Sequence, residues 1–197
     1  MLFHSTRGGD KDRTFEDILM QGLASDGGLF MPDAWPQVNL NLLRSKSSFI
    51  EVAKEIVPLF TSSSFDKEEV INILDNTWHD FSDEDIAPLK HLDDNKAVLE
   101  LFHGPTAAFK DFGLQLAAAF FNKVLNKNNK TAIILGATSG DTGSAAIDAC
   151  KNFKSIKTFI LIPDGNMSEI QRRQMTTIDE DNVCLLYTSD AADDSDC

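Results

Sequence analysis

One lysine lies in a segment whose residue types suit carbonyl chemistry. Residues 103–111 read His-Gly-Pro-Thr-Ala-Ala-Phe-Lys-Asp, and a strongly apolar stretch, 112–125, follows. If Asp111 caps a helix there, Lys110 lies among apolar side chains at the positive end of the helix dipole, and both effects favour the neutral amine. A neutral amine is the nucleophile that attacks a carbonyl group. The competing interpretation is a solvated surface lysine, as most lysines are.

A second segment has the composition of an anion-binding loop. Residues 136–143 read Gly-Ala-Thr-Ser-Gly-Asp-Thr-Gly. Gly140 and Gly143 permit a close backbone approach, and Ser139 and Thr142 add hydroxyl groups to the free N–H groups of a helix start. This favours binding of a carboxylate or phosphate, although a tight turn with an Asp or Thr cap explains the segment equally well. It matches neither the Walker P-loop nor the dinucleotide-binding glycine pattern.

Short apolar runs of strand length precede both segments. The runs are 97–102, 131–135 and 157–162, and each is followed by a loop with glycine and then a helical pattern. Repeated strand, loop and helix indicate an α/β fold, an open parallel sheet with helices on both faces. Ligands of such sheets bind beyond the carboxyl ends of the strands, where 103–111 and 136–143 are expected to lie.

The first part of the chain is predicted to be mainly helical. Apolar residues recur there at helical spacing, behind residues that cap helices. The stretches concerned are 14–24, 48–60 and 66–78. Residues 82–96 are polar, acidic and interrupted by Pro88, which favours a boundary. We therefore expect a mainly helical domain over 1–90 and an incomplete α/β domain over 91–183.

Composition restricts the class of protein. The 197 residues are 42% hydrophobic and 25% charged, as in ordinary globular proteins. The net charge of -13 repels phosphate backbones and anionic lipids, so we expect neither nucleic acid nor membrane as a partner. No apolar run reaches the roughly 20 residues of a membrane span, and residues 1–13 lack the apolar stretch of a secretory signal. These features favour a cytoplasmic protein.

Cysteine and histidine usage predicts no metal site. Cys150, Cys184 and Cys197 are too few and too scattered for a disulfide framework or a zinc site. The four histidines have no metal-ligand spacing, and His103 is interpreted as a hydrogen-bonded loop residue.

The last fourteen residues differ in composition from the rest. Residues 184–197 read CLLYTSDAADDSDC, with four aspartates, two cysteines and no basic residue. They resemble the translation of a sequencing adapter, so we expect a non-native tail. A natural acidic, disordered tail is the alternative.

Taken together, the lysine segment and the glycine loop resemble those of threonine synthase, a pyridoxal-phosphate enzyme of the tryptophan-synthase β-like fold. Four further stretches resemble that family: 5–8, 25–32, 164–165 and 174–177. The resemblance covers nearly all of 1–183 and stops at Cys184, whereas family members continue for considerably longer.

The resemblance implies a fold type II enzyme whose cofactor, pyridoxal 5'-phosphate, is held covalently by Lys110. Asp141 is implied to lie near the ring hydroxyl of the cofactor. The loop implied to hold the substrate carboxylate contains Thr138, Ser139, Gly140 and Thr142. Arg7, Arg172 and Arg173 are candidates for binding the substrate phosphate.

The implied reaction is γ-elimination of phosphate from O-phosphohomoserine, followed by addition of water at the β-carbon to give L-threonine, with Lys110 as proton shuttle. Family members hold the cofactor phosphate with a later glycine-rich loop and the ring nitrogen with a later hydroxyl residue. Residues 144–183 contain neither. We therefore expect an N-terminal fragment that is inactive alone, with an apolar surface partly exposed near 112–124.

Two alternatives to this function remain. One is another pyridoxal-phosphate enzyme that performs β- or γ-elimination on a different amino acid. The other is a non-catalytic, threonine-synthase-like binder of a phosphorylated amino acid. The sequence leaves the oligomeric state open.

Overall fold

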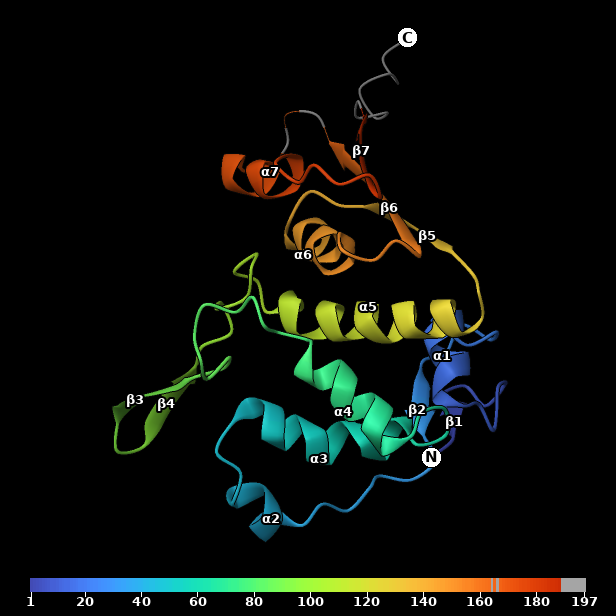
Figure 1. The fold of residues 1–197 in the computed structure, drawn as a ribbon, viewed down its shortest axis with the longest axis vertical. Helices are drawn as coiled ribbons and strands as arrows, with labels where there is room; N and C mark the ends of the chain where they lie inside the picture. Colours follow the sequence, from blue (N-terminus) through green and yellow to red (C-terminus); the bar gives the residue numbers. More distant parts are fainter. Residues whose placement is uncertain (164, 166, 189–197) are drawn as a thin grey trace. The chain divides into compact units, whose positions relative to one another are not determined.

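The computed structural model describes residues 1–163, 165 and 167–188, and the chain divides into two compact units (Figure 1). The first unit is Met1–His79 and the second is Asp80–Cys197. The expected domain limits, 1–90 and 91–183, stay a prediction. Among the described residues, no helix combines the length and apolar character needed to cross a bilayer.

The first unit is mainly helical, with one small antiparallel sheet. Its strands, β1 (Phe3–Ser5) and β2 (Phe30–Pro32), pair His4 with Met31. Its helices are α1 (Phe15–Gln21), α2 (Leu40–Arg44), α3 (Phe49–Thr61) and α4 (Lys67–Asp75). The side chains of Thr14, Ser48 and Asp66 cap α1, α3 and α4. These caps explain why the periodic stretches begin as helices where the sequence predicts them.

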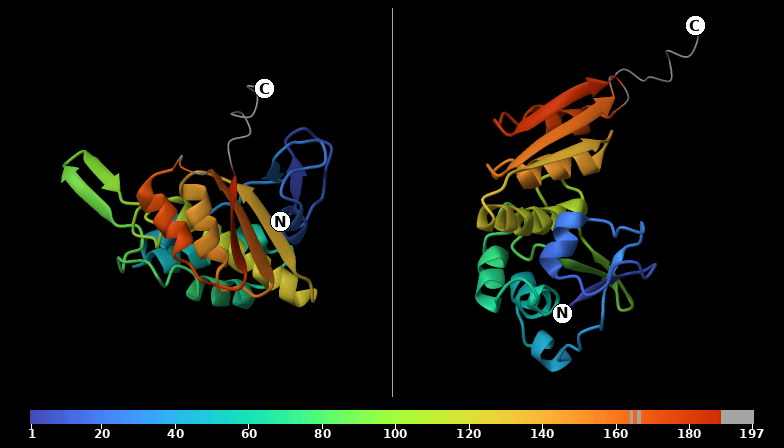
Figure 2. Two further views of the ribbon diagram at one scale, coloured as in Figure 1. Left: turned by 90° about the horizontal axis from the view of Figure 1, so that it is seen from above. Right: turned by 90° about the vertical axis from the view of Figure 1, so that its right-hand side faces the viewer.

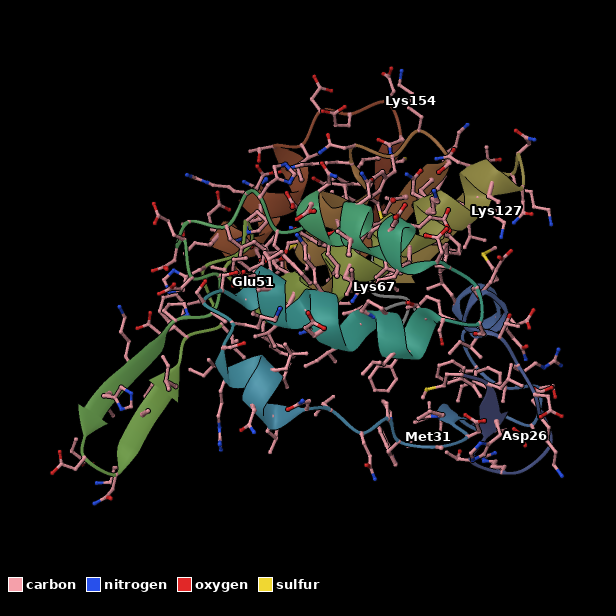
Figure 3. All side chains as sticks on the ribbon, turned by 60° about the horizontal axis from the view of Figure 1, so that its bottom comes forward. Asp26, Met31, Glu51, Lys67, Lys127 and Lys154 are labelled. Atoms are coloured by element: carbon pink, nitrogen blue, oxygen red, sulfur yellow. The ribbon has the colours of Figure 1, made fainter. Side chains whose placement is uncertain are left out.

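A carboxylate joins the two N-terminal stretches that resemble the family. Asp26, which is labelled in Figure 3, lies in the loop before β2. Its carboxylate accepts hydrogen bonds from Ser5 Oγ at 2.6 Å and from the Gly9 N–H at 2.7 Å. The guanidinium of Arg7 donates to the backbone carbonyl of Asp26 at 3.0 Å. Hydrogen bonds from the Ser5 hydroxyl, first, and from the Gly28 and Gly9 N–H groups hold the pKa of Asp26 below its usual range. The carboxylate thus cross-links the two loops at the start of the chain.

The second unit contains a three-stranded parallel sheet in the order β5-β6-β7. The strands are β5 (Ala132–Ala137), β6 (Ile156–Pro163) and β7 (Val183–Thr188), and the helices are α5 (Lys110–Lys127), α6 (Asp141–Cys150) and α7 (Glu169–Thr176). Helix α6 connects β5 to β6 and lies between α5 and α7 (Figure 1). This arrangement confirms the predicted α/β class with a parallel sheet.

Helices α5, α6 and α7 of this unit cover one face of this sheet. Ile160 of β6 is buried against Ile147 of α6 and Met175 of α7. Side chains alternate across a strand, so Ile133 and Leu135 of β5 point to the opposite face, where they are 68% and 69% exposed. The second covering layer expected from the sequence is not found among the described residues.

The partly exposed apolar surface expected near 112–124 stays a prediction, since Phe112, Leu114, Leu116 and Phe121 are half-buried. No large apolar side chain of this stretch of α5 is among the exposed residues. Ala118 and Leu125 of α5 pack with Cys150 and Ile156 at the end of α6 and the start of β6. The exposed apolar side chains of this region lie on β5 instead.

A correction concerns the run 97–102, expected to begin the parallel sheet. Strands β3 (Leu89–Asp93) and β4 (Lys96–Leu99) form an antiparallel hairpin in which every residue is exposed. Figure 2 shows this hairpin projecting from the rest of its unit. The Asn95 N–H donates to Asp93 Oδ1 at 2.9 Å and closes the turn, so residues from the expected boundary segment 82–96 supply the partner strand.

Strand β7 includes residues 184–188 of the tail that the sequence predicts to be non-native. It pairs with β6 in parallel, from Thr158 with Val183 to Pro163 with Thr188. Because backbone hydrogen bonds between strands do not depend on side-chain identity, this pairing says nothing about the origin of the tail, which stays a prediction. Residues 189–197 lie outside the described residues.

Candidate functional site

Helix α5 begins at Lys110 and is preceded by a closed loop. Its N-cap is Phe109, whose side chain makes no capping hydrogen bond. Asp111, expected to be the N-cap, lies inside the first turn and is fully buried. That expectation is wrong because the Asp111 carboxylate binds the preceding loop and not the first N–H groups of the helix.

The bonding of Asp111 determines the shape of the loop. Its carboxylate accepts the Thr106 N–H at 2.9 Å and the Thr106 hydroxyl at 2.6 Å. A Cβ on residue 104 would overlap this carboxylate, so the sequence needs Gly104 there. Ala107 has a positive φ of 57°, a conformation that costs a non-glycine residue energy and that the surrounding bonds maintain.

Lys110 is half-buried at the edge of this loop. Its Nζ lies 4.8 Å from the ring centroid of Phe109, which is itself 62% exposed. This is the geometry of a cation–π contact. Within the part of the chain that the structure describes, no carboxylate pairs with the Lys110 amine, so the amine is available to a ligand.

The second candidate loop leads from β5 into α6. Gly140 donates its N–H to Thr138 Oγ1 at 3.2 Å and is the N-cap of α6, with no side-chain capping bond. Ser139, Asp141 and Thr142 are exposed at this helix start. The loop therefore presents hydroxyl groups and helix N–H groups to solvent, as an anion-binding loop does.

A close contact positions this loop against α7. A Cβ on residue 143 would overlap the Thr138 methyl group and the Met175 sulfur. Gly143 thus allows α6 to approach α7, a packing role that the sequence analysis did not assign to it.

Two glutamines of α7 connect the candidate loops, and sequence reasoning missed both. Gln174 Nε2 donates to the Thr106 carbonyl at 2.9 Å, and Gln171 Nε2 donates to Asp141 Oδ1 at 2.7 Å. Residues three apart lie on one face of a helix. Lys110's loop and Asp141 are therefore held on the same side of α7. The resemblance of 174–177 to the family was the only signal in the sequence.

Arg172, Arg173 and His103 each pair with a glutamate three or four residues away in the sequence. Glu169 accepts from Arg172 at 2.9 Å and Arg173 at 2.8 Å, and these bonds lower its pKa to about 2. His103 Nε2 lies 2.8 Å from Glu100 Oε2, so His103 is a hydrogen-bonded loop residue as expected. Asp164, in one stretch resembling the family, lies outside the described residues.

Proteins called threonine synthase are similar to this chain in sequence and in structure. Residues 2–78 match the family described as the threonine synthase N terminus. The threonine synthase of Pseudomonas aeruginosa is 45% identical over 185 residues, which make up 93% of this chain and 39% of the relative. The Xenopus laevis protein called threonine synthase-like 2 is 38% identical over an alignment of 199 residues, with 100% of this chain and 42% of the relative covered.

A solved structure is also similar to this chain. The crystal structure of pyridoxal-phosphate-bound threonine synthase from Brucella melitensis matches with a TM-score of 0.90 at 40% identity, over 94% of this chain and 40% of that chain. This chain therefore spans about two fifths of the length of the proteins it matches.

Proposed function

The chain belongs to the threonine synthase family, and we propose that it supplies the N-terminal part of a pyridoxal-phosphate-dependent threonine synthase. The proposed reaction is γ-elimination of phosphate from O-phosphohomoserine, followed by addition of water at the β-carbon to give L-threonine. The observation that carries the proposal is the half-buried Lys110, which has no acidic partner among the described residues and follows directly after a loop closed by Asp111.

The residues of the two candidate loops fit the cofactor. Lys110 offers the cofactor aldehyde an amine that has no carboxylate partner among the described residues. The loop before Lys110 is connected through α7 to Asp141, whose exposed carboxylate can accept from the ring hydroxyl. When bound, pyridoxal phosphate acts as an electron sink that acidifies the α-proton of an attached amino acid.

The chain's own groups then have distinct roles. Lys110 Nζ, freed when the substrate amine displaces it from the cofactor, would take the proton from the substrate α-carbon and return it later in the reaction. The hydroxyl groups of Thr138, Ser139 and Thr142, with the N–H groups at Gly140 and the start of α6, bind the substrate carboxylate. The helix start also attracts negative charge, which orients the carboxylate toward the loop.

The site is incomplete in this chain, and we propose that the chain alone does not turn over. Residues 144–183 contain a single glycine, Gly165, and hence no glycine-rich loop for the cofactor phosphate. A reactive lysine without a phosphate anchor lacks most of the binding free energy and preorganisation of a whole site. We further propose a cytoplasmic enzyme whose partner is a small molecule, since the net charge of -13 disfavours nucleic acid and anionic membranes.

A non-catalytic role is the second candidate. The relative called threonine synthase-like 2, whose name states a likeness to the enzyme and not the activity, aligns along the entire chain. A binder of a phosphorylated amino acid needs the loop at 138–142 but no reactive lysine. Another eliminating enzyme of the same cofactor class needs both but acts on a different amino acid.

Covalent labelling tests the role of Lys110. The chain is incubated with pyridoxal phosphate, reduced with borohydride and mapped by peptide mass spectrometry. We expect the pyridoxyl group on Lys110, and its loss in Lys110→Arg but not in the control Lys90→Arg, which alters an exposed lysine of the β3–β4 hairpin. A label on other lysines only would refute the assignment.

An assay of phosphate release from O-phosphohomoserine tests the reaction. Residues 1–197 and 1–183 are expected to release none. A chimera in which residues 1–183 replace the matching part of the Pseudomonas aeruginosa relative is expected to form threonine. Turnover by either short chain would contradict the inactivity proposed for it, and an inactive, folded chimera that still binds the substrate would favour the non-catalytic role.

A further inference from the structure

We propose that α7 is a clamp that holds two loops in a fixed position relative to each other, the Lys110 loop (residues 103–111) and the Asp141 loop (residues 136–143). Gln174 and Gln171 are its positioning residues. The inference rests on the proposed function for its catalytic meaning, since it concerns the two loops assigned to cofactor and substrate. Its structural basis is independent of that assignment and consists of two hydrogen bonds and one packing contact.

The first bond completes the partners of a buried residue. Thr106 is 8% exposed, and Asp111 binds both its N–H and its hydroxyl. The carbonyl of Thr106 is the remaining polar group, and Gln174 satisfies it from another helix, 68 residues away. Buried polar groups require partners, so the hydrogen bond from Gln174 stabilises this part of the Lys110 loop.

The second bond holds the exposed carboxylate of Asp141. Ser168, the N-cap of α7, donates from Oγ to Gln171 Oε1 at 3.0 Å. That bond orients the Gln171 amide with its NH₂ group toward Asp141 Oδ1, 2.7 Å away. An exposed aspartate otherwise samples several rotamers, so Gln171 selects one.

The packing contact between Met175 and Gly143 fixes α7 against α6, and so keeps the two hydrogen bonds in a constant position relative to each other. Met175 is fully buried, and its sulfur lies 2.8 Å from the position that a Cβ on residue 143 would take, which is too close for a real Cβ. Gln171, Gln174 and Met175 follow the three- and four-residue spacing of one helix face. A movement of α7 would therefore shift both loops together, whereas loss of one glutamine should release one loop only.

The test uses the full chain and methionine replacements of similar length. Gln174→Met and Gln171→Met each remove one donor, and Ile170→Met is the control because Ile170 is 73% exposed on the same helix. Amide hydrogen exchange is read from peptides that cover 103–111 and 138–143. A second readout is the rate at which pyridoxal phosphate modifies Lys110 before borohydride reduction.

We expect a selective pattern. Gln174→Met should speed exchange in 103–111 by about fivefold, the size of one net hydrogen bond, and slow the modification of Lys110. Gln171→Met should speed exchange in 138–143 only. Gln171→Lys should retain the exchange rate of the unmodified chain, because an ammonium group can donate to Asp141. The control should resemble the unmodified chain.

Two outcomes would overturn the clamp. One is unchanged exchange in both glutamine variants. The other is faster exchange throughout the unit with a lowered melting temperature, which indicates general destabilisation. The proposed function fails separately: if Lys110 of the unmodified chain takes up no cofactor while the selective exchange pattern appears, the clamp stands and the assignment of the lysine does not.

Discussion

The carboxylate of Asp111 binds both the backbone N–H and the side-chain hydroxyl of Thr106, at 2.9 and 2.6 Å. Because Asp111 is fully buried and lies in the first turn of α5, this pair attaches the loop before Lys110 to the helix that begins with Lys110. The position of the candidate catalytic lysine thus depends on a neighbour that the sequence analysis interpreted as a helix cap.

Thr106→Val should destabilise the chain by about 1.5–3 kcal/mol, because it removes a hydrogen bond to a buried carboxylate without changing the side-chain shape. The measurement is the free energy of unfolding in urea. Thr131→Val is the matched control, since Thr131 is exposed just before β5, and it should change stability by less than about 0.5 kcal/mol. Equal effects of the two substitutions would show that the bond to Asp111 adds no net stability.

Two helical glycines should respond to alanine with opposite signs. Gly113→Ala in α5 places a Cβ in open space, so helix propensity should raise the free energy of unfolding by about 0.5–1 kcal/mol. Gly143→Ala places a Cβ against Thr138 and Met175, and overpacking should outweigh propensity and cost about 1–3 kcal/mol. Urea unfolding measures both. A stabilised Gly143→Ala variant would indicate that α6 and α7 are not in close contact.

Cys150 should be unreactive while the chain is folded. Burial raises the pKa of its thiol from 9.0 to about 11, which lowers the thiolate fraction by about a hundredfold at neutral pH. Alkylation at pH 8, mapped by mass spectrometry, should therefore label Cys150 about a hundredfold more slowly in the folded chain than in urea. Similar rates in both states would contradict its burial.

The same shift predicts a loss of stability in alkaline solution. The folded state favours the neutral Cys150 thiol, so the stabilisation is complete below pH 9, the pKa of the unfolded chain, and is lost as the pH rises toward 11. The slope should approach about 1.4 kcal/mol per pH unit for this one proton. Urea unfolding of Cys150→Ala supplies the comparison, since this slope should be missing from the variant.

Thr142→Val in the chimera with the Pseudomonas aeruginosa relative should raise KM for O-phosphohomoserine by about tenfold, because one hydrogen bond to the substrate carboxylate is lost. The cofactor absorbance should stay nearly the same, since the substitution leaves Lys110 and Asp141 in place. Steady-state phosphate release and absorbance titration give the two quantities. Loss of the cofactor with an unchanged KM would instead assign the loop at 138–142 to cofactor binding.

The sequence by itself determined the features that depend on local interactions. The helices α1, α3 and α4 begin behind the capping residues Thr14, Ser48 and Asp66, and β5 and β6 coincide with apolar runs. Caps act within one helical turn, and apolar runs indicate burial over a few residues, so both can be recognised without knowledge of the fold. The parallel sheet followed from the order of these elements along the chain.

Tertiary structure alone decided which elements became neighbours. The run 97–102 has strand character, but strand propensity does not specify which strand it pairs with. In the structure β4 pairs with β3 and not with the parallel sheet. Asp111 could cap a helix or bind a loop, and the close approach of Gly104 and Thr106 selected the loop. The bond from Gln174 to Thr106 joins residues 68 positions apart. No local pattern encodes such a contact, because it forms only after packing has brought the two segments together.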